Sequence, residues 1–404
     1  ELTNLIKLAI VISSSQDCVT MQVNPHQMVK DGRMRPVPVI PDYSGANLTG
    51  IIPGCLLGTS GRRPNWFPQP LQDAERIVLL VIDGLGYEQL QRHAHIAPNL
   101  MSLVGGSITT IAPSTTASAL TSLVTGASPA EHGIVGYRMD MGDSVMNSLR
   151  WWSDTRDLRK VHPPASVQPI PPFVGMTIPV VSRAELEGSA FTEAHLRGSR
   201  PCGWRAASSI VAQCANLISS GEKFVYAYYD GVDKIAHERG FGAYYDAEIA
   251  ATDWLVGALL NTLPSGTTLA ITADHGQVQV DDNVVHLSDD IKATLHHQSG
   301  EGRFRWLHAK RGQESDLLQI ATDLYSDIAW IASRDQVVEE AWLGPARGGR
   351  IADQVKRRLG DVALVPFTAT TFDDPLDSGP FSLVCRHGSL TADEMFVPFL
   401  ARTV

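Results

Sequence analysis

The sequence predicts an α/β fold, a doubly wound and mostly parallel sheet sandwiched by helices, with a smaller inserted cap segment. Strand-like apolar runs recur along the chain, and helical patterns separate several of them, as expected where crossover helices join parallel strands. The first run, Ile77–Ile82, is continuous rather than alternating, which is typical of a strand buried on both faces. The 404 residues, 44% of them hydrophobic, are enough to bury a substantial core.

The later elements follow the same reasoning. Four further runs predict sheet strands: Phe224–Tyr229, Thr268–Thr272, 328–331 and 362–365. The clearest helix is expected over residues 244–263, where Trp254 and other apolar residues recur at helical spacing before a Pro-Ser-Gly stop. A shorter helix is expected over 117–124, ending at Gly126.

The chain divides into an arm and one large domain. Residues 1–72 are rich in Pro, Gly and Asn without a sustained period, so we expect an irregular N-terminal arm. The domain then spans 73–404. Within it, two segments, about 138–203 and 281–366, interrupt the recognisable motifs and are expected to be lid-like insertions.

Composition excludes several classes of protein. A net charge of −10 argues against binding a nucleic-acid polymer through a basic surface. No apolar run approaches the roughly 18 residues of a membrane span, which predicts a soluble protein. The five cysteines are scattered without CxxC spacing, so no disulfide framework is indicated. The apolar stretch 5–12 contains Lys7 and no cleavage pattern follows it, which favours a cytoplasmic location over a secreted one. The oligomeric state stays open.

Acidic and imidazole residues follow the expected strands, where an open α/β sheet places its ligand sites. Asp233 and His237 are four residues apart, so a helical turn would put both side chains on one face. The whole set contains no thiolate and suits Zn²⁺ or Mn²⁺, with Fe²⁺ or Co²⁺ possible. It comprises Asp83, Asp233, His237, Asp274, His275 and His387.

The segment 113–118 places hydroxyl groups directly before the expected helix at 117–124. One interpretation is a plain N-cap, since Ser and Thr are preferred there. The functional interpretation is a nucleophile that attacks a phosphorus whose oxygens are held by the free N–H groups at the helix start.

Taken in order, these motifs resemble the alkaline phosphatase superfamily, and most closely its type I phosphodiesterase/nucleotide pyrophosphatase branch. The resemblance implies an alkaline phosphatase-like fold and hydrolysis of phosphodiester or pyrophosphate bonds in nucleotide-like or other small phosphoesters. The motifs that carry it are Val81-Ile82-Asp83-Gly84, Pro113-Ser114-Thr115-Thr116, Leu123-Val124-Thr125-Gly126, His132-Gly133-Ile134, Asp233-x-x-x-His237, Asp274-His275-Gly276 and His387-Gly388.

The resemblance further implies a site for two divalent metal ions, zinc in the first place and manganese in the second. Counting back from Val124-Thr125-Gly126, the nucleophile position falls on Thr116, which would form a phosphothreonine intermediate. One ion would be bound by Asp83, Thr116, Asp274 and His275. The other would be bound by Asp233, His237 and His387. Three aspartates and a threonine alkoxide would balance the charge of the two cations.

Several other functions are compatible with these residues, and one is disfavoured. A phosphomonoesterase, a phosphonate hydrolase or a phospho-transferase could use the same site, and a non-catalytic binding protein could use the same fold. A dinucleotide-binding dehydrogenase is disfavoured, because Asp83-Gly84-Leu85-Gly86 lacks the third glycine of the fingerprint.

The chain departs from the family at the positions that contact substrate. After the nucleophile it has Ala117-Ser118-Ala119-Leu120, without the aromatic residue that holds a nucleobase. Tyr137 replaces a phosphate-binding asparagine, and its hydroxyl could still donate to phosphate. Arg303 and Arg305 share a strand face and would either contact phosphate or lie on a solvated edge. Five further histidines are expected not to be ligands: His132, which would satisfy loop backbone, and His286, His296, His297 and His308.

Overall fold

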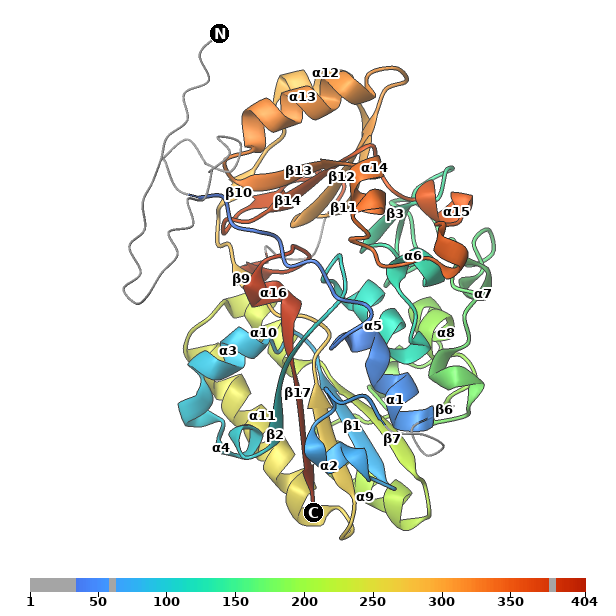
Figure 1. Ribbon diagram of the computed structural model, residues 1–404, viewed down its shortest axis with the longest axis vertical. Coiled ribbons are helices and arrows are strands. Elements are labelled where there is room, and N and C mark those ends of the chain that lie inside the picture. The colour runs from blue at the N-terminus through green and yellow to red at the C-terminus, as the bar shows by residue number, and fades with distance from the viewer. Residues whose placement is uncertain (1–33, 58–62, 378–382) are drawn as a thin grey trace, which may run out of the picture.

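The computed structural model describes residues 34–57, 63–377 and 383–404, and it contains a central seven-stranded sheet (Figure 1). β17 runs antiparallel to both of its neighbours, and the other pairings are parallel. The predicted mostly parallel sheet is therefore confirmed. In spatial order its strands are β2 (Val104–Thr109), β17 (Phe396–Thr403), β8 (Thr268–Thr272), β1 (Ile77–Ile82), β7 (Phe224–Tyr229), β5 (Pro179–Val181) and β6 (Arg200–Pro201).

β1 lies at the centre of this sheet, and all six of its residues are buried. Its register places Val81 opposite Thr272 of β8 and Ile82 opposite Tyr229 of β7. Because the three strands are parallel, the residues that follow them emerge at the same edge of the sheet. This register is what brings the expected acidic side chains together.

Helices cover both faces of the central sheet (Figure 1). On one side lie α3 (Tyr87–Arg92), α4 (Pro98–Met101), α10 (Gly231–Arg239) and α11 (Ala243–Thr262), with α9 (Ser208–Ser219) packed against α11. On the other lie α1 (Ile51–Leu57), α5 (Thr116–Thr125) and α8 (Ala190–Leu196). The long helix expected at 244–263 is α11, but Trp254 is 57% exposed and does not belong to its buried face.

A second, antiparallel sheet lies beyond the first and carries α12 (Asp289–Thr294) and α13 (Glu314–Tyr325) on its outer face (Figure 1). Leu307, Leu317 and Leu364 belong to its separate apolar core. The runs at 328–331 and 362–365 are thus strands, but they belong to this sheet and not to the central one. Its order is β11 (Leu295–Glu301), β12 (Phe304–Ala309), β14 (Val362–Pro366) and β13 (Ala329–Ser333).

The segment 138–203 contributes to two sheets. It begins with a two-stranded ribbon, β3 (Arg138–Asp140) and β4 (Val145–Asn147), and it ends in β5 and β6, which complete the central sheet. The expected arm at 1–72 is partly helical where it is described, and Ile51 and Ile52 of α1 are fully buried in the core. Residues 1–33 of that arm lie outside the described residues.

The remaining elements are short. They are η2 (Leu48–Gly50), α2 (Gln69–Gln72), η4 (Ala94–Ile96), α6 (Pro129–His132), α7 (Pro164–Val167), η5 (Pro172–Gly175), η6 (Ala184–Leu186), β9 (Val278–Gln279), β10 (Val284–Val285), α14 (Arg334–Glu339), η7 (Arg347–Gly349), α15 (Asp353–Lys356), β15 (Thr371–Phe372), β16 (Cys385–Arg386) and α16 (Ala392–Met395). No helix in the described part of the chain has the length and apolarity needed to cross a lipid bilayer.

Arg303 and Arg305 are buried structural residues, so both explanations offered for them from the sequence are wrong. Arg303 is fully buried, and its guanidinium donates to Glu394 Oε1 at 2.7 Å and Oε2 at 2.8 Å. It also donates to the Thr370 carbonyl at 2.6 Å. Arg305 is 1% exposed and lies 3.5 Å from Asp374. Arg303 thus joins the turn between β11 and β12 to α16, and Arg305 of β12 contacts the segment that follows β15.

Breaking the buried ion pair between Arg303 and Glu394 is expected to destabilise the protein strongly. Glu394→Gln should lower the free energy of unfolding by about 3–5 kcal/mol, because it leaves a buried guanidinium charge without its counterion. Denaturant unfolding of both proteins measures the difference. The matched control is Asp335→Asn, which removes an exposed ion pair with Lys356 and should cost at most about 1 kcal/mol. Equal effects of the two substitutions would contradict the structural role given to Arg303.

Candidate active site

Asp83 and Asp274 lie side by side at the ends of β1 and β8. The backbone N–H groups of Gly84 and His275 both donate to Asp274 Oδ1 at 3.0 Å, which fixes that carboxylate. His275 Nε2 lies 3.5 Å from Asp83 Oδ1 and 3.4 Å from Asp274 Oδ2. All three side chains are at most 2% exposed. The first expected ligand group is therefore assembled.

A second group lies against the first. Asp233 and His237 project from the same face of α10, with His237 Nε2 3.2 Å from Asp233 Oδ1. His387 Nε2 lies 4.0 Å from the same oxygen. The rings of His387 and His275 stack at 3.6 Å between centroids, so they join the two groups. All six expected acidic and imidazole side chains thus converge from distant parts of the chain.

Thr116 is the first residue of α5, and its Oγ1 lies 3.1 Å from His275 Nε2. Thr115 occupies the N-cap position but makes no side-chain capping hydrogen bond. A plain N-cap therefore does not explain this hydroxyl pair. Gly126 ends the helix with a φ of 68°, as the sequence predicted for the terminating glycine.

Backbone carbonyls orient the three imidazoles. Nδ1 of His237 lies 2.7 Å from the Cys385 carbonyl, and Nδ1 of His387 lies 2.9 Å from the Ser114 carbonyl. Nδ1 of His275 lies 3.1 Å from its neighbouring carbonyl, that of Gly276. Because a carbonyl only accepts, each Nδ1 carries the proton, and each Nε2 presents a lone pair to the carboxylates. This is the tautomer that metal-binding histidines adopt.

Burial and mutual charge shape the ionisation of the cluster. Burial, reinforced by neighbouring carboxylates, raises the pKa of Asp83 well above its usual range, and burial also raises the pKa of Asp274. Burial and the rings of His275 and His237 lower the pKa of His387. Burial opposes the downward shift at Asp233, but the surrounding imidazoles outweigh it and lower the pKa of that carboxyl. Like charges packed this closely need a counter-charge.

The unsatisfied atoms fit divalent cations. Asp83 Oδ1 and Asp274 Oδ2 are buried, and neither has a hydrogen-bond partner among the described residues. A buried carboxylate oxygen without a partner is costly unless a cation neutralises it. Two groups of residues at the site could each hold an ion, because the donor atoms within each group all lie within 4.8 Å of one another. The first group is Asp83, Asp274 and His275. The second is Asp233, His275 and His387.

Three contacts at the site were not recognised in the sequence. Gln277 Nε2 donates to Asp233 Oδ1 at 2.8 Å, the Tyr228 hydroxyl donates to Asp83 Oδ2, and Ser114 supplies the carbonyl for His387. Gln277 directly follows Asp274-His275-Gly276, and only this position next to a motif could have indicated from the sequence that Gln277 belongs to the site. His132, by contrast, accepts from the Ile134 N–H at 3.0 Å and is fully buried, which confirms its structural role.

Two cavities, of about 420 and 470 Å³, meet at Thr116. They share Thr116, Leu149, Asp233 and Lys234 as lining residues. The first has an apolar wall that includes Leu120 and Phe191. Such volumes are typical of sites for small molecules.

The second cavity is polar. Tyr137, which was expected to contact substrate, lines it together with Thr116. Arg150 and Arg386 also line it, and Arg386 Nε has no hydrogen-bond partner within the described ranges. Glu301 lies on the same wall, where burial raises its pKa to about 8. The cavity therefore offers cations together with carboxyl groups, among them those of Glu301 and Asp377.

This fold and site define a class of protein, the metal-dependent phosphoric ester hydrolases of the alkaline phosphatase superfamily. Residues 77–373 match the family described as type I phosphodiesterase / nucleotide pyrophosphatase. The match covers most of the chain, so the protein belongs to this family, as its motifs predicted, and is an enzyme of this class. A comparison with curated protein sequences finds no significant match.

Solved structures share the fold. Human ectonucleotide pyrophosphatase/phosphodiesterase 5 superposes with a TM-score of 0.60 at 17% identity, covering 81% of this chain and 87% of that one. The murine protein gives 0.59 at 15% identity, covering 81% and 88%. Phosphonoacetate hydrolase from Sinorhizobium meliloti gives 0.55 at 16% identity, covering 84% and 91%. Nothing in the structure or these comparisons supports the expected cytoplasmic location.

Proposed function

We propose that this enzyme hydrolyses phosphodiester or pyrophosphate bonds of small, nucleotide-like phosphoesters, with Thr116 as nucleophile and two zinc ions in its site. Thr116 and Asp83, Asp274 and His275 would hold one ion, and Asp233, His237 and His387 would hold the other. One observation carries the proposal: the Thr116 hydroxyl lies 3.1 Å from His275, at the meeting point of two cavities and two carboxylate–imidazole groups.

When bound, paired divalent ions stabilise the negative charge that develops on oxygen during in-line displacement at phosphorus. Thr116 Oγ loses its proton to solvent and attacks the phosphorus, so that a P–Oγ bond forms while the bond to the leaving oxygen breaks, and that oxygen takes a proton from solvent. Water then attacks the phosphothreonine and restores the hydroxyl. The free N–H groups at the start of α5 favour the phosphoryl oxygens electrostatically.

The two cavities favour a diester over a monoester. A phosphodiester carries two substituents on phosphorus, and each of the cavities that meet at Thr116 can receive one of them. Phe191 lines the apolar cavity and could pack against a base that the α5 residues cannot hold. One related murine structure is described as an inactive variant in complex with AMP, which is consistent with a nucleotide-like substrate.

Phosphonate hydrolysis is the second candidate. The polar cavity contains Arg150 and Arg386, and a small phosphonate with a second anionic group would place that group near these cations. The similarity to phosphonoacetate hydrolase, whose structure is described with phosphonoformate, adds to this alternative.

A substrate comparison separates the candidates. We expect kcat/KM for bis-p-nitrophenyl phosphate to exceed that for p-nitrophenyl phosphate by about 100-fold, which corresponds to ~2.7 kcal/mol of transition-state stabilisation. The p-nitrophenyl ester of phenylphosphonate, which also carries one negative charge, should follow the diester. Faster hydrolysis of the monoester would refute the diesterase proposal, and phosphate release from phosphonoacetate would establish the second candidate.

A further inference from the structure

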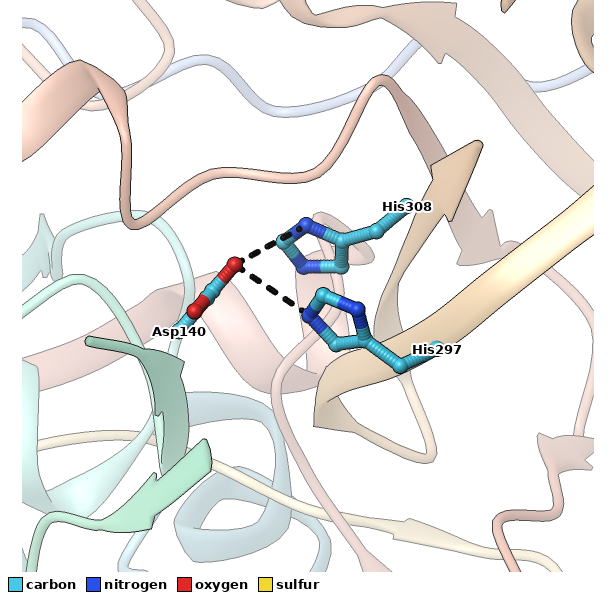
Figure 2. Close-up of side chains that lie close together, drawn as sticks. All are labelled: Asp140, His297 and His308. Carbon is cyan, nitrogen blue, oxygen red and sulfur yellow. Dashed lines mark ion pairs between the residues drawn. The ribbon is translucent and has the colours of Figure 1, made fainter. Parts of the chain in front are cut away.

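A further cluster of possible metal ligands, Asp140, His297 and His308, lies outside the candidate active site. Asp140 ends β3, while His297 and His308 lie on the neighbouring strands β11 and β12 of the second sheet. Figure 2 shows the carboxylate of Asp140 facing both imidazole rings. Asp140 Oδ2 lies 3.2 Å from His297 Nε2 and 3.4 Å from His308 Nδ1. No pattern in the sequence groups these residues, and both histidines were expected not to be ligands.

The spacing of these three atoms suits a tetrahedral metal ion. Zn²⁺ binds nitrogen and carboxylate oxygen at about 2.0–2.1 Å, which separates neighbouring ligands of a tetrahedron by about 3.3–3.4 Å. The two measured distances, 3.2 and 3.4 Å, agree with this value. The three donor atoms all lie within 4.8 Å of one another. Little movement would be needed to enclose an ion.

The hydrogen bonding of His297 leaves one nitrogen unexplained. Its Nδ1 lies 2.7 Å from Nδ1 of His296, whereas its Nε2 is buried and has no hydrogen-bond partner in the described part of the chain. Its polar neighbour is Asp140 Oδ2, an ion pair at 3.2 Å that lacks hydrogen-bond geometry and therefore offsets little of the cost of burial. A cation between His297 Nε2 and Asp140 would remove that cost.

His308 is held in place with one ring nitrogen facing Asp140. Its side chain is buried, and its ring stacks on that of His297 at 3.9 Å. Its Nε2 lies 2.7 Å from Ser299 Oγ. If Nε2 donates to that hydroxyl, the lone pair on Nδ1 points to Asp140. Arg334, the nearby cation acting on His308, is paired with Asp361 at 3.1 Å.

We propose that Asp140 Oδ2, His297 Nε2 and His308 Nδ1 bind a third divalent transition-metal ion, Zn²⁺, with water as its fourth ligand. Two imidazoles and one carboxylate form a donor set that Zn²⁺ binds well. The ion would tie the β3–β4 ribbon to the second sheet. Because Tyr137 directly precedes β3, this cross-link would fix the segment that lines the polar cavity of the active site.

Metal binding tests the proposal directly. Metal-free protein, checked for folding by circular dichroism, is titrated with Zn²⁺ by calorimetry, and bound zinc is counted after gel filtration. His308→Ala and Asp140→Asn should each bind one equivalent less than the wild type. The matched control is His286→Ala, because His286 also contacts an aspartate, Asp373 at 3.1 Å, but is exposed and outside the cluster. This control should bind as many equivalents as the wild type.

A further variant separates this site from the active site. Asp83→Asn with Asp274→Asn should weaken binding at the active site and retain the equivalent that His308→Ala removes. Co²⁺ is a second probe, because its tetrahedral complexes absorb visible light. When His308→Gln is introduced into the Asp83→Asn, Asp274→Asn variant, the Co²⁺-loaded protein should lose part of its visible absorption. Equal zinc content and equal Co²⁺ spectra with and without the His308 substitutions would overturn the proposal, whatever the active site binds.

Discussion

Replacing Thr116 by alanine is expected to reduce kcat for bis-p-nitrophenyl phosphate by about 10⁴-fold or more, because it removes the proposed nucleophile. Zinc content should change little, since the aspartates and histidines of both groups remain. Steady-state kinetics and elemental analysis on the same preparation measure both effects.

Two controls sharpen this prediction. Thr116→Ser keeps a hydroxyl at the start of α5 and should retain much of the activity. Thr115→Ala removes the hydroxyl of the neighbouring N-cap residue, whereas the contact with His275 belongs to Thr116, so this substitution should affect kcat far less than Thr116→Ala. Unchanged hydrolysis by Thr116→Ala would show that Thr116 is not the nucleophile.

Removing the metal ions is expected to lower activity more than 100-fold, since the loss of a residue that merely supports a ligand already costs about 10–100-fold. Without cations, burial raises the pKa of both Asp83 and Asp274 and favours their neutral forms, so nothing at this position would stabilise the negative charge of the phosphoryl group. Dialysis against a chelator, followed by addition of Zn²⁺ or Mn²⁺, should abolish and then restore hydrolysis.

Mg²⁺ is the matched control for that restoration. It prefers octahedral oxygen ligands and should restore little activity at a site that contains three imidazoles. Full activity in protein from which zinc and manganese have been stripped would contradict the two-metal site.

The sequence predicted those parts of the site that depend on local pattern. Ile77–Ile82 is recognisable because a central parallel strand is apolar throughout, and its end places Asp83 at the ligand-binding edge. Asp233 and His237 follow a strand at helical spacing, which predicted that both side chains project from one face. Such features need only the residues next to them in the chain.

Other parts depend on contacts between distant residues and could not be predicted. Arg303 has the alternating spacing of an exposed strand face, but its partner Glu394 lies 91 residues away and buries it. The strand around Trp330 has the same apolar pattern whichever sheet it joins, and only its pairing with β14 assigns it to the second sheet. Glu301 carries no motif, although it lies in the wall of the polar cavity.

The most direct test of the two-metal site is a crystal structure of the zinc-loaded enzyme with anomalous data collected at the zinc edge. The account predicts one anomalous peak bounded by Asp83, Asp274, His275 and Thr116, and a second bounded by Asp233, His237 and His387. The Thr116 hydroxyl should lie in contact with the first ion. A zinc-loaded, active crystal without anomalous density between these residues would contradict the account.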